Sequence, residues 1–257
     1  MGADDYLAKG LAARDRYKDE PLIRFSMAPH APYSVSDRAF ARVVTLAEEL
    51  DLPIHLHLHE SREEIEGGLA QHGRRPLRRM HSLGVLGPRL IAVHAVHLDD
   101  HEIELLARHG ASVAHCPSSN LKLASGFAPI HKLLAAGVNI GLGSDGAASN
   151  NRLDLFQEMR LAALLAKGAS GNPQAMPATA ALEAATLGGA RALGLDRTLG
   201  SIEPGKAADL CAVEFTSPGL LPCYDPISHL VYVAGRENVS NVWIGGKLTV
   251  TYGEKAA

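Results

Sequence analysis

Residues 53–60 read Pro-Ile-His-Leu-His-Leu-His-Glu, an alternation of histidine with aliphatic residues that ends on a carboxylate. Because alternate residues of a β-strand point to the same face, His55, His57 and His59 should share one face of a strand. The aliphatic residues should form the opposite face, packed against a helix. A face of imidazoles is not typical of a core, since buried neutral imidazoles need hydrogen-bond partners. The stretch therefore indicates a strand end used for metal binding or acid–base chemistry.

Short apolar runs alternate with helical patterns on both sides of this stretch. The strands predicted for this part of the chain cover residues 22–28, 54–59, 90–94, 111–115 and 138–143. The helices between them begin at capping residues, including Ser36, a Ser61–Glu64 capping box and the Asp99–Glu102 pair. Five consecutive strand–helix units favour a βα barrel over an open doubly wound sheet. No glycine-rich dinucleotide fingerprint follows these strands, which also disfavours the open sheet.

The pattern changes near residue 195, where the sequence becomes rich in turns. The helices and strands predicted from there and just before it cover residues 178–186, 188–193, 208–214 and 242–250. The last of these contains a Gly245-Gly246 turn. We predict an α/β protein with a partial TIM-like (β/α) barrel over residues 1–195, equivalent to strands 4–8 of a full barrel. Residues 196–257 should form part of a small β-sandwich domain.

Composition narrows the class of protein. The chain has 257 residues, of which 46% are hydrophobic, so it can bury a sizeable core. The formal net charge is −3 without a Lys/Arg-rich run, which argues against nucleic acid or an acidic membrane surface as a partner. Cys116, Cys211 and Cys223 are scattered and indicate free thiols in a reducing compartment. We therefore expect a cytoplasmic protein, with homo-oligomerisation left open.

The carboxyl ends of the predicted strands carry most of the titratable residues of interest. In a βα barrel these ends open on one face, where the active site lies. The residues at or just after them are His30, His57, His59, Glu60, His94, His97, His115, Asn120 and Asp145. Imidazoles and carboxylates that converge on one opening indicate a hydrolytic metal site with His and Asp ligands to Zn²⁺ or a similar ion.

Several longer motifs resemble the amidohydrolase superfamily. They are His-Leu-His-Glu (57–60), Val-His-Ala-Val-His-Leu (93–98), His-Cys-Pro-Ser-Ser-Asn-Leu-Lys-Leu-Ala-Ser-Gly (115–126), Gly-Leu-Gly-Ser-Asp-Gly-Ala-Ala-Ser-Asn-Asn (141–151) and Gly-Ser-Ile-Glu-Pro-Gly-Lys-Ala-Ala-Asp-Leu (200–210). Within the superfamily they are similar to the triazine-hydrolase branch, and most closely to the 5′-methylthioadenosine/S-adenosylhomocysteine deaminases. The resemblance extends from about residue 20 to 250.

This resemblance implies a role for five residues. His57 and Asp145 match metal ligands, and Asp145 also matches a catalytic, substrate-contacting carboxylate. Glu60 matches the carboxylate that contacts the purine and protonates its ring nitrogen. His94 matches a catalytic histidine that assists in activating water, and His30 matches a substrate-contacting histidine. His55, His59, His97 and His115 match no ligand position, and we predict that they are packing or supporting histidines.

The implied reaction is the hydrolytic deamination of 5′-methylthioadenosine or S-adenosylhomocysteine, an adenosine-type purine, to the inosyl product with release of ammonia. One Zn²⁺ per subunit is expected, with Fe²⁺ or Mn²⁺ as alternatives, and the partner is a small-molecule purine nucleoside. Two alternatives stay open. One is another hydrolase of the branch, acting on 8-oxoguanine, guanine or a triazine. The other is a catalytically dead half-barrel that binds or assembles.

One feature of the family is missing from the sequence. The first barrel strand of the family ends in a His-x-His pair that supplies two metal ligands, and the His55-Leu-His57 spacing here belongs to the fifth-strand motif instead. The chain resembles the C-terminal part of the family, from just before its fourth strand. We therefore expect the isolated chain to bind zinc poorly and to be nearly inactive.

Overall fold

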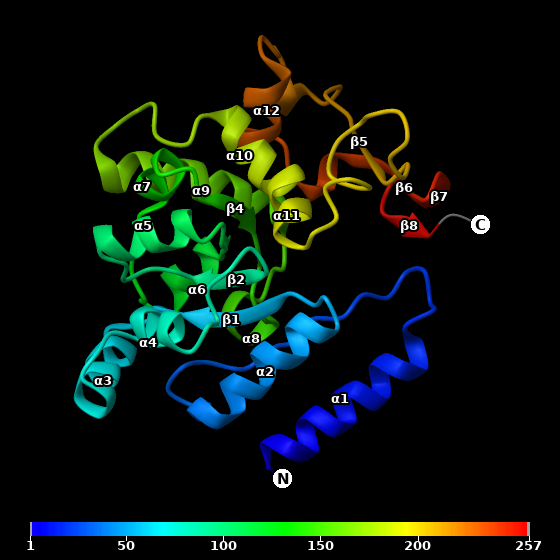
Figure 1. Cartoon of the computed structure of the whole chain (residues 1–257). Coiled ribbons are helices and arrows are strands. Elements are labelled where there is room, and N and C mark those ends of the chain that lie inside the picture. The colour runs from blue at the N-terminus through cyan, green and yellow to red at the C-terminus, as the bar shows by residue number, and fades with distance from the viewer. Residues whose placement is uncertain (1, 256–257) are drawn as a thin grey trace.

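The computed structural model describes residues 2–255 and shows an α/β protein with two separate sheets (Figure 1). The larger sheet has four parallel strands in the order β1-β2-β3-β4, and the smaller has four antiparallel strands in the order β5-β6-β7-β8. The parallel strands are β1 (Ile54–Leu58), β2 (Leu90–His94), β3 (Ser112–His115) and β4 (Asn139–Leu142). Four of the five strands predicted for this half are thus confirmed, and the parallel sheet with them.

Helices connect the successive parallel strands, because parallel neighbours need a long crossover. These connecting helices are α3 (Arg62–His72), α4 (Pro76–Ser82), α5 (Asp100–Arg108), α6 (Pro117–Lys122) and α7 (Ile130–Ala135). The register pairs Leu58 with His94 and His115 with Leu142, so neighbouring strands end at the same level. Residues at the strand ends are thereby brought to one edge of the sheet.

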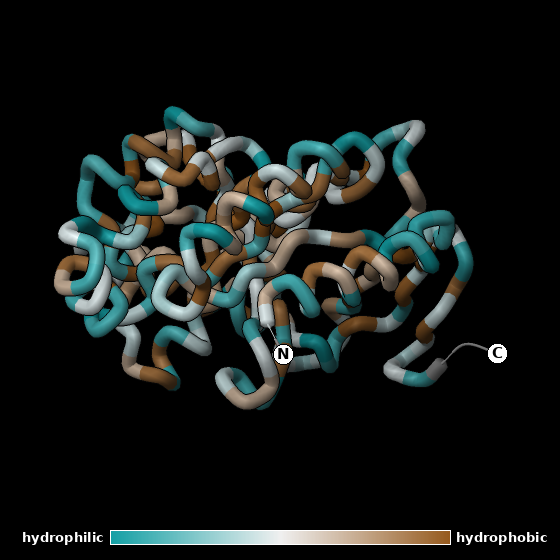
Figure 2. The backbone as a smooth tube through the Cα atoms, turned by 60° about the horizontal axis from the view of Figure 1, so that its bottom comes forward, coloured by the Kyte–Doolittle hydropathy of each residue, from teal (hydrophilic) through white to brown (hydrophobic). Residues whose placement is uncertain are grey.

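Strand β1 has one buried face and one accessible face. Leu56 and Leu58 are fully buried, whereas His55 is exposed and His57 is half-buried. The aliphatic face belongs to a core that includes Phe40 of a neighbouring helix. Figure 2 shows the hydrophobic segments running mainly through the interior of the molecule and the hydrophilic ones around it. The predicted division of this strand into an aliphatic core face and a histidine face is confirmed for these four positions.

The first part of the chain contributes two helices. Ser36 caps α2 (Asp37–Glu49) as predicted, because its side-chain oxygen accepts a hydrogen bond from the nitrogen of Ala39 at 3.3 Å. Helix α1 (Ala3–Tyr17) was not predicted from the sequence. It buries none of its residues and is tied to α2 by an ion pair between Asp4 and Arg42.

Two predictions for this half were wrong in detail. The strand expected over residues 22–28 is reduced to a single parallel bridge between Met27 and Ile54. Pro29 has no N–H to continue a ladder. The Ser61–Glu64 pair does not form a capping box: Ser61 caps α3, but the Glu64 carboxylate binds backbone N–H groups at the end of β1 instead. The Asp99–Glu102 capping box of α5 is confirmed.

The rest of the chain adds helices around the parallel sheet and then the antiparallel sheet. The helices are α8 (Ala147–Asn150), α9 (Leu155–Ser170), α10 (Ala178–Ala185), α11 (Leu187–Ala192), the 3-10 turn η1 (Pro218–Leu220), α12 (Pro226–Tyr232) and the 3-10 turn η2 (Arg236–Asn238). The strands are β5 (Leu210–Val213), β6 (Val239–Ile244), β7 (Lys247–Thr251) and β8 (Glu254–Lys255). No helix among residues 2–255 has the length and apolar composition needed to cross a membrane.

The described part of the second predicted segment, residues 196–255, contains a helix that contacts earlier helices and the antiparallel sheet. Helix α12 lies against α9 and α10, and Arg160 of α9 donates a hydrogen bond to the carbonyl of Ala234 at 2.7 Å. The remainder forms the antiparallel sheet, in which Gly245 and Gly246 make the turn between β6 and β7 with positive φ angles of 56° and 79°. The domain boundary at residue 195 and the sandwich stay predictions.

Candidate metal centre

The backbone takes unusual conformations where the parallel strands end. His59, His94, Ala95 and Asp145 have positive φ angles of 58°, 71°, 50° and 60°. This left-handed region is sterically disfavoured for residues with a Cβ atom, and such strain tends to be kept at functional sites. The chain therefore turns sharply at the ends of β1 and β2 and shortly after β4, where the predicted site residues lie.

Three of the predicted site residues meet at these ends. One donor atom each of His57, His94 and Asp145 lies within 4.8 Å of the other two, and within residues 2–255 this is the single group of three such side chains. The rings of His57 and His94 stack with centroids 5.5 Å apart and an interplanar angle of 21°. Two imidazoles and a carboxylate are a donor set suited to Zn²⁺ and similar divalent ions. These residues therefore fit a bound metal.

Hydrogen bonds set the direction of both imidazoles. Nδ1 of His57 lies 2.7 Å from the carbonyl oxygen of His30, and Nδ1 of His94 lies 2.8 Å from Oδ1 of Asn120. Since both of these oxygens can only accept, each Nδ1 carries the hydrogen. In the neutral rings Nε2 then keeps its lone pair, which is the form that a metal ion binds.

Asp145 is held as a carboxylate. Oδ2 accepts a hydrogen bond from the Ser119 hydroxyl at 2.6 Å, and Oδ1 accepts one from the nitrogen of Gly146 at 2.7 Å. Burial acts to raise the pKa of Asp145, but the bonds from Ser119 and Gly146 and the nearby His94 together hold this pKa below its usual value. The group is therefore ionised at neutral pH and can serve as a ligand or accept a proton.

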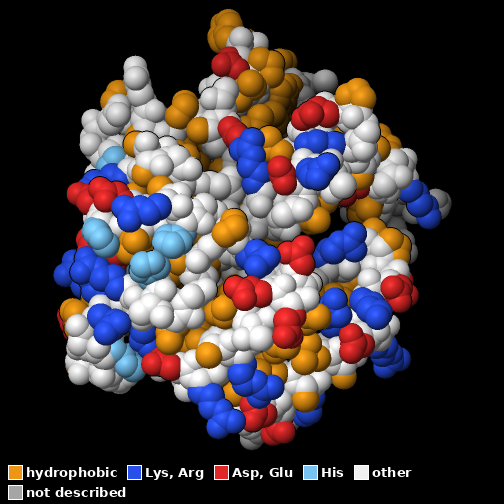
Figure 3. Space-filling model, viewed as in Figure 1, with side chains coloured by type: hydrophobic (Ala, Val, Ile, Leu, Met, Phe, Trp, Pro, Cys, Tyr) orange, Lys and Arg blue, Asp and Glu red, His pale blue; other side chains and the backbone are white. Residues whose placement is uncertain are grey.

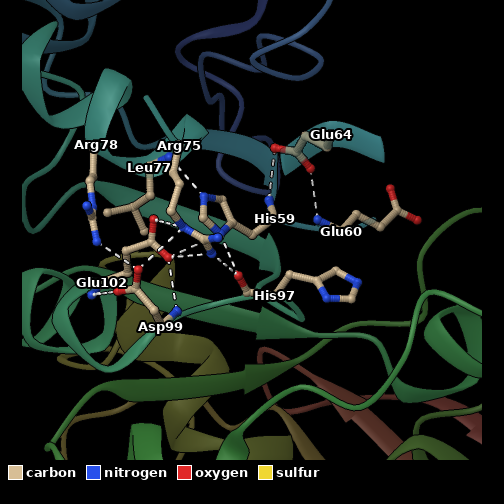
Figure 4. A network of polar contacts seen from close by, with 9 residues as sticks. All are labelled: His59, Glu60, Glu64, Arg75, Leu77, Arg78, His97, Asp99 and Glu102. Carbon is tan, nitrogen blue, oxygen red and sulfur yellow. Dashed lines mark hydrogen bonds and ion pairs between the residues drawn. The ribbon is translucent and has the colours of Figure 1, made fainter. Parts of the chain in front are cut away.

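Glu60 lies beside this group. Its Oε2 is 3.8 Å from Nε2 of His94, and its side chain is partly exposed. The backbone of Glu60 is fixed by Glu64, whose carboxylate accepts hydrogen bonds from the nitrogens of His59 and Glu60 at 3.0 and 2.9 Å. Figure 4 shows Glu64 reaching back to these nitrogens while the Glu60 side chain extends the other way. Burial raises the pKa of Glu64 to about 6, although the two backbone bonds oppose the shift.

His30 lies next to the group on its exposed side. Its ring centroid is 5.3 Å from that of His57, and its Nδ1 lies 2.8 Å from Oγ of Ser34. The Ser34 hydroxyl donates to the carbonyl of Ala31 at 3.2 Å, so the ring nitrogen of His30 is the donor in their bond. Nε2 of His30 then has a lone pair that can accept a hydrogen bond, and its contact to substrate stays a prediction.

His59 does not share a face with His55 and His57, contrary to the sequence prediction. Strand β1 ends at Leu58, and the positive φ of His59 turns its side chain into the protein, where it is fully buried. Nδ1 bonds to the carbonyl of His97 at 3.0 Å and Nε2 accepts from the nitrogen of Leu77 at 2.9 Å. Burial lowers the pKa of His59 to about 4. With both ring nitrogens engaged, His59 has a supporting role.

The other histidines without a predicted ligand role are also outside the metal group. His97 is half-buried with Nε2 2.8 Å from the carbonyl of Ser125, and His55 is exposed on β1. His115 is buried at the end of β3, and burial lowers its pKa to about 3. Its Nδ1 has no partner within the described chain.

An ion pair between a half-buried arginine and a buried carboxylate holds the loop that follows β2. Both nitrogens of one edge of the Arg75 guanidinium donate to the fully buried Glu102 carboxylate at 2.9 Å, and Arg75 also donates to the carbonyl of His97 (Figure 4). The same carbonyl accepts from His59. The loop after His94 is therefore fixed by His59, which the sequence predicted as a packing or supporting histidine, and by Arg75, which was not connected with the site.

A second buried carboxylate supports the other side of the group. Glu158 of α9 accepts from the nitrogen of Ser118 at 3.0 Å and from the side-chain amide of Asn150 at 2.8 Å. Asn150 in turn donates to the carbonyl of Ser144, next to Asp145, at 2.8 Å. The sequence signal for Glu158 and Glu64 is weak: each is an acid in the first turn of a helix that follows a site strand, where solvated acids are also common.

The face of the molecule shown in Figure 3 carries acidic and basic side chains side by side rather than a broad patch of one sign. This mixture agrees with the low formal net charge of −3.

Comparison with known proteins places this geometry in a family. The sequence matches the amidohydrolase family over residues 7–249. A 5-methylthioadenosine/S-adenosylhomocysteine deaminase of Teredinibacter turnerae is 47% identical over 247 residues, which are 96% of this chain and 56% of that protein. A 5′-deoxyadenosine deaminase of Methanothermobacter thermautotrophicus is 45% identical over 232 residues, which are 90% of this chain and 54% of that protein. The chain spans about half the length of the curated relatives it matches.

Solved structures give the same result. The fold matches an adenosine deaminase from Xanthomonas campestris with bound zinc at a TM-score of 0.97 and 49% identity, over 98% of this chain and 58% of that one. It matches an atrazine chlorohydrolase from Arthrobacter aurescens TC1 complexed with zinc at a TM-score of 0.93 and 28% identity, over 99% and 57% of the two chains. The resemblance to amidohydrolases of the triazine-hydrolase branch, with deaminases as close relatives, is confirmed.

Proposed function

Because this chain belongs to the amidohydrolase family, we propose that it supplies metal-binding and proton-transfer groups for the hydrolytic deamination of an adenosine-type purine nucleoside. The observation that carries the proposal is the meeting of His57, His94 and Asp145 at one point, with Glu60 3.8 Å from His94. Such a hydrolysis needs side chains that bind a divalent metal ion and, next to them, an acid that transfers a proton.

Zinc is the metal we propose, bound by His57 and Asp145. Two related structures contain zinc, and nitrogen and carboxylate donors suit this ion, with Fe²⁺ or Mn²⁺ as alternatives. A bound zinc ion would supply a water of lowered pKa as the nucleophile. Nε2 of His94, directed by Asn120, faces the same point and provides a third donor or a hydrogen-bond acceptor that assists in activating that water. The site therefore has one more donor than the two ligands expected from the sequence.

The side chains of this chain account for the proton transfers. Water adds to the ring carbon that bears the amino group, and Glu60 gives a proton to the adjacent ring nitrogen as charge develops there. Asp145, a carboxylate whose pKa is held below its usual value, takes a proton from the water and passes it to the departing amine. As ammonia leaves, the hydroxyl proton of the adduct returns to Glu60, and a keto purine remains. His30 contacts the substrate through its free Nε2.

The substrate we propose is 5′-methylthioadenosine, S-adenosylhomocysteine or a closely related 5′-substituted adenosine. The support is the 45–47% identity to relatives that carry such names over most of this chain. A triazine is the second candidate, because the atrazine chlorohydrolase fold matches over 99% of the chain at a TM-score of 0.93. Its identity of 28% is lower, so the nucleoside is favoured.

Ammonia release tests this proposal. A C-terminal affinity tag on the chromosomal gene would recover the protein as the cell expresses it, together with any subunit bound to it. The purified protein is assayed against 5′-methylthioadenosine, S-adenosylhomocysteine, 5′-deoxyadenosine, guanine, 8-oxoguanine and atrazine. We expect the 5′-substituted adenosines to be the best substrates. Faster turnover of a triazine or of guanine would change the substrate assignment, and zinc-replete protein inactive on the whole panel would overturn the deaminase proposal.

A further inference from the structure

The helix that follows the middle strand of the site contributes two side chains that each bond to a donor residue of the metal group. Strand β3 lies between β2 and β4 in the sheet, and residues 119 and 120 follow it in α6. Asn120 bonds to His94 at the end of β2, and Ser119 bonds to Asp145 after β4. Two successive residues of one short helix therefore hold two of the three donor side chains from the side.

A buried carboxylate holds the backbone just before Ser119 and Asn120. Glu158 is fully buried and binds the backbone nitrogen of Ser118, immediately before the pair. Through Asn150 it also connects to the segment that carries Asp145. Asn120 itself is almost completely buried, so its amide cannot turn freely to exchange partners with water. The Asn120–His94 bond is thus a fixed contact within the fold.

We propose that Asn120 is a positioning residue that holds His94 in the Nδ1–H form, so that Nε2, 3.8 Å from Glu60, keeps the lone pair with which it would bind a metal ion. The inference deepens the proposed function and rests on it for its purpose. His94 has no other hydrogen-bond partner at Nδ1 among the described residues. If the proton were on Nε2, this atom could neither bind a metal ion nor accept a proton from water.

Ser119 gives a matched comparison within the same helix. It bonds to Asp145 and makes no bond to His94, so its loss should weaken the metal group without changing the proton position on His94. Residues that orient a metal ligand typically contribute roughly 10- to 100-fold to metal affinity. The two neighbours should therefore have similar effects on affinity and different effects on the imidazole of His94.

The experiment reads the proton position directly by ¹⁵N NMR of the histidine side chains in the metal-free folded chain, at a pH where His94 is neutral. Asn120→Leu removes the acceptor at similar volume, Asn120→Asp keeps an acceptor, and Ser119→Ala is the control. His94 signals are assigned by their loss in His94→Gln. Co²⁺ affinity of each variant is measured by its visible absorption.

We expect Nδ1–H in the unmodified chain, in Asn120→Asp and in Ser119→Ala, and a mixture of both forms in Asn120→Leu. Co²⁺ affinity should fall roughly 10- to 100-fold in Asn120→Leu and be restored by Asn120→Asp. An Nε2–H form of His94 in the unmodified chain would overturn the inference without any variant, even if a variant fails to fold. So would a folded Asn120→Leu chain that keeps Nδ1–H. Neither result depends on turnover. A failure of this inference can therefore be told apart from a failure of the deaminase proposal.

Discussion

The two sheets of this molecule differ in where they place left-handed backbone. At the carboxyl ends of the parallel strands it falls on side-chain-bearing residues, His59, His94 and Asp145. In the antiparallel sheet it falls mostly on glycine, at Gly245, Gly246 and Gly253, with Tyr252 as the exception. Glycine adopts this conformation without steric cost, whereas other residues need the surrounding structure to hold them there. Strained backbone therefore occurs in the parallel sheet where side chains are directed toward the site, whereas most turns of the antiparallel sheet are built without it.

Buried polar groups follow the same division. Glu64, Glu102 and Glu158 are buried around the strand ends and bind backbone or side-chain donors there. Among the described residues of the antiparallel strands, Ser240 is the single buried polar side chain. Buried carboxylates are costly unless their hydrogen bonds are complete, so they are kept where they fix a geometry. Substitutions at the strand ends should therefore change metal binding and chemistry, and those in the antiparallel sheet should change stability alone.

The largest effect is expected for His57→Ala. Removing a donor leaves His94 and Asp145, fewer than the three protein ligands that catalytic zinc sites normally use. Zinc affinity should fall by more than about 100-fold, beyond the effect of losing an orienting residue. His55→Ala, on the same strand but exposed, is the control and should leave affinity unchanged. Isothermal titration of the natively expressed protein with zinc measures both, and equal affinities for the two variants would contradict the site.

The next largest effect concerns turnover. Glu60→Gln in the natively expressed protein should lose on the order of 100- to 10,000-fold in kcat, because glutamine cannot transfer the proton. Its zinc content should not change, since Glu60 is outside the group of three donors. Glu63→Gln, at an exposed position in the first turn of α3, is the control. A Glu60→Gln protein that deaminates at the unmodified rate would remove Glu60 from the mechanism.

A smaller effect is expected for the pH dependence of stability. Burial lowers the pKa of His59 from its ordinary value of 6.5 to about 4. Below pH 6.5 His59 is therefore protonated in the unfolded chain but not in the folded chain. The free energy of unfolding falls as the pH is lowered from 6.5 to about 4. The loss from this group should reach about 3 kcal/mol.

Urea unfolding at several pH values measures this loss. His59→Gln can keep one acceptor and one donor for Leu77 and His97 without titrating, so its stability should fall less steeply with acid. If the unmodified chain and His59→Gln lose the same free energy between pH 6.5 and 4, His59 is not held neutral by burial.

The smallest effect is expected in the antiparallel sheet. Gly246 has a φ of 79°, and an added Cβ would meet the Cβ of Ala208 at an ordinary 3.8 Å. Gly246→Ala should therefore destabilise the chain by about 1 kcal/mol through backbone strain alone. Thermal unfolding gives the stability, and zinc titration should match the unmodified chain. A clear change in zinc affinity would show that a substitution in the antiparallel sheet affects the metal site as well as stability.

The sequence predicted the parts that depend on local pattern. Alternation predicted β1, and the positions of His57 and Asp145 at strand ends predicted that they would lie together. It failed at His59, because period-two alternation cannot show where a strand stops, and the chain turns one residue earlier than expected. It also missed Glu64 and Glu158, since their partners are backbone nitrogens and an amide fixed only by the tertiary fold. Position at the strand ends, together with the family resemblance, therefore indicated the candidate donors but not the residues that hold them.

Anomalous diffraction at the zinc edge tests most directly whether His57, His94 and Asp145 form one metal site. The crystals are grown from the natively expressed protein with zinc. We expect a peak bound to His57 and Asp145 at about 2.0–2.2 Å, with Nε2 of His94 directed at it. Zinc found instead at surface histidines such as His81 and His109, whose ring centroids are 4.8 Å apart, with none at the strand ends, would contradict it.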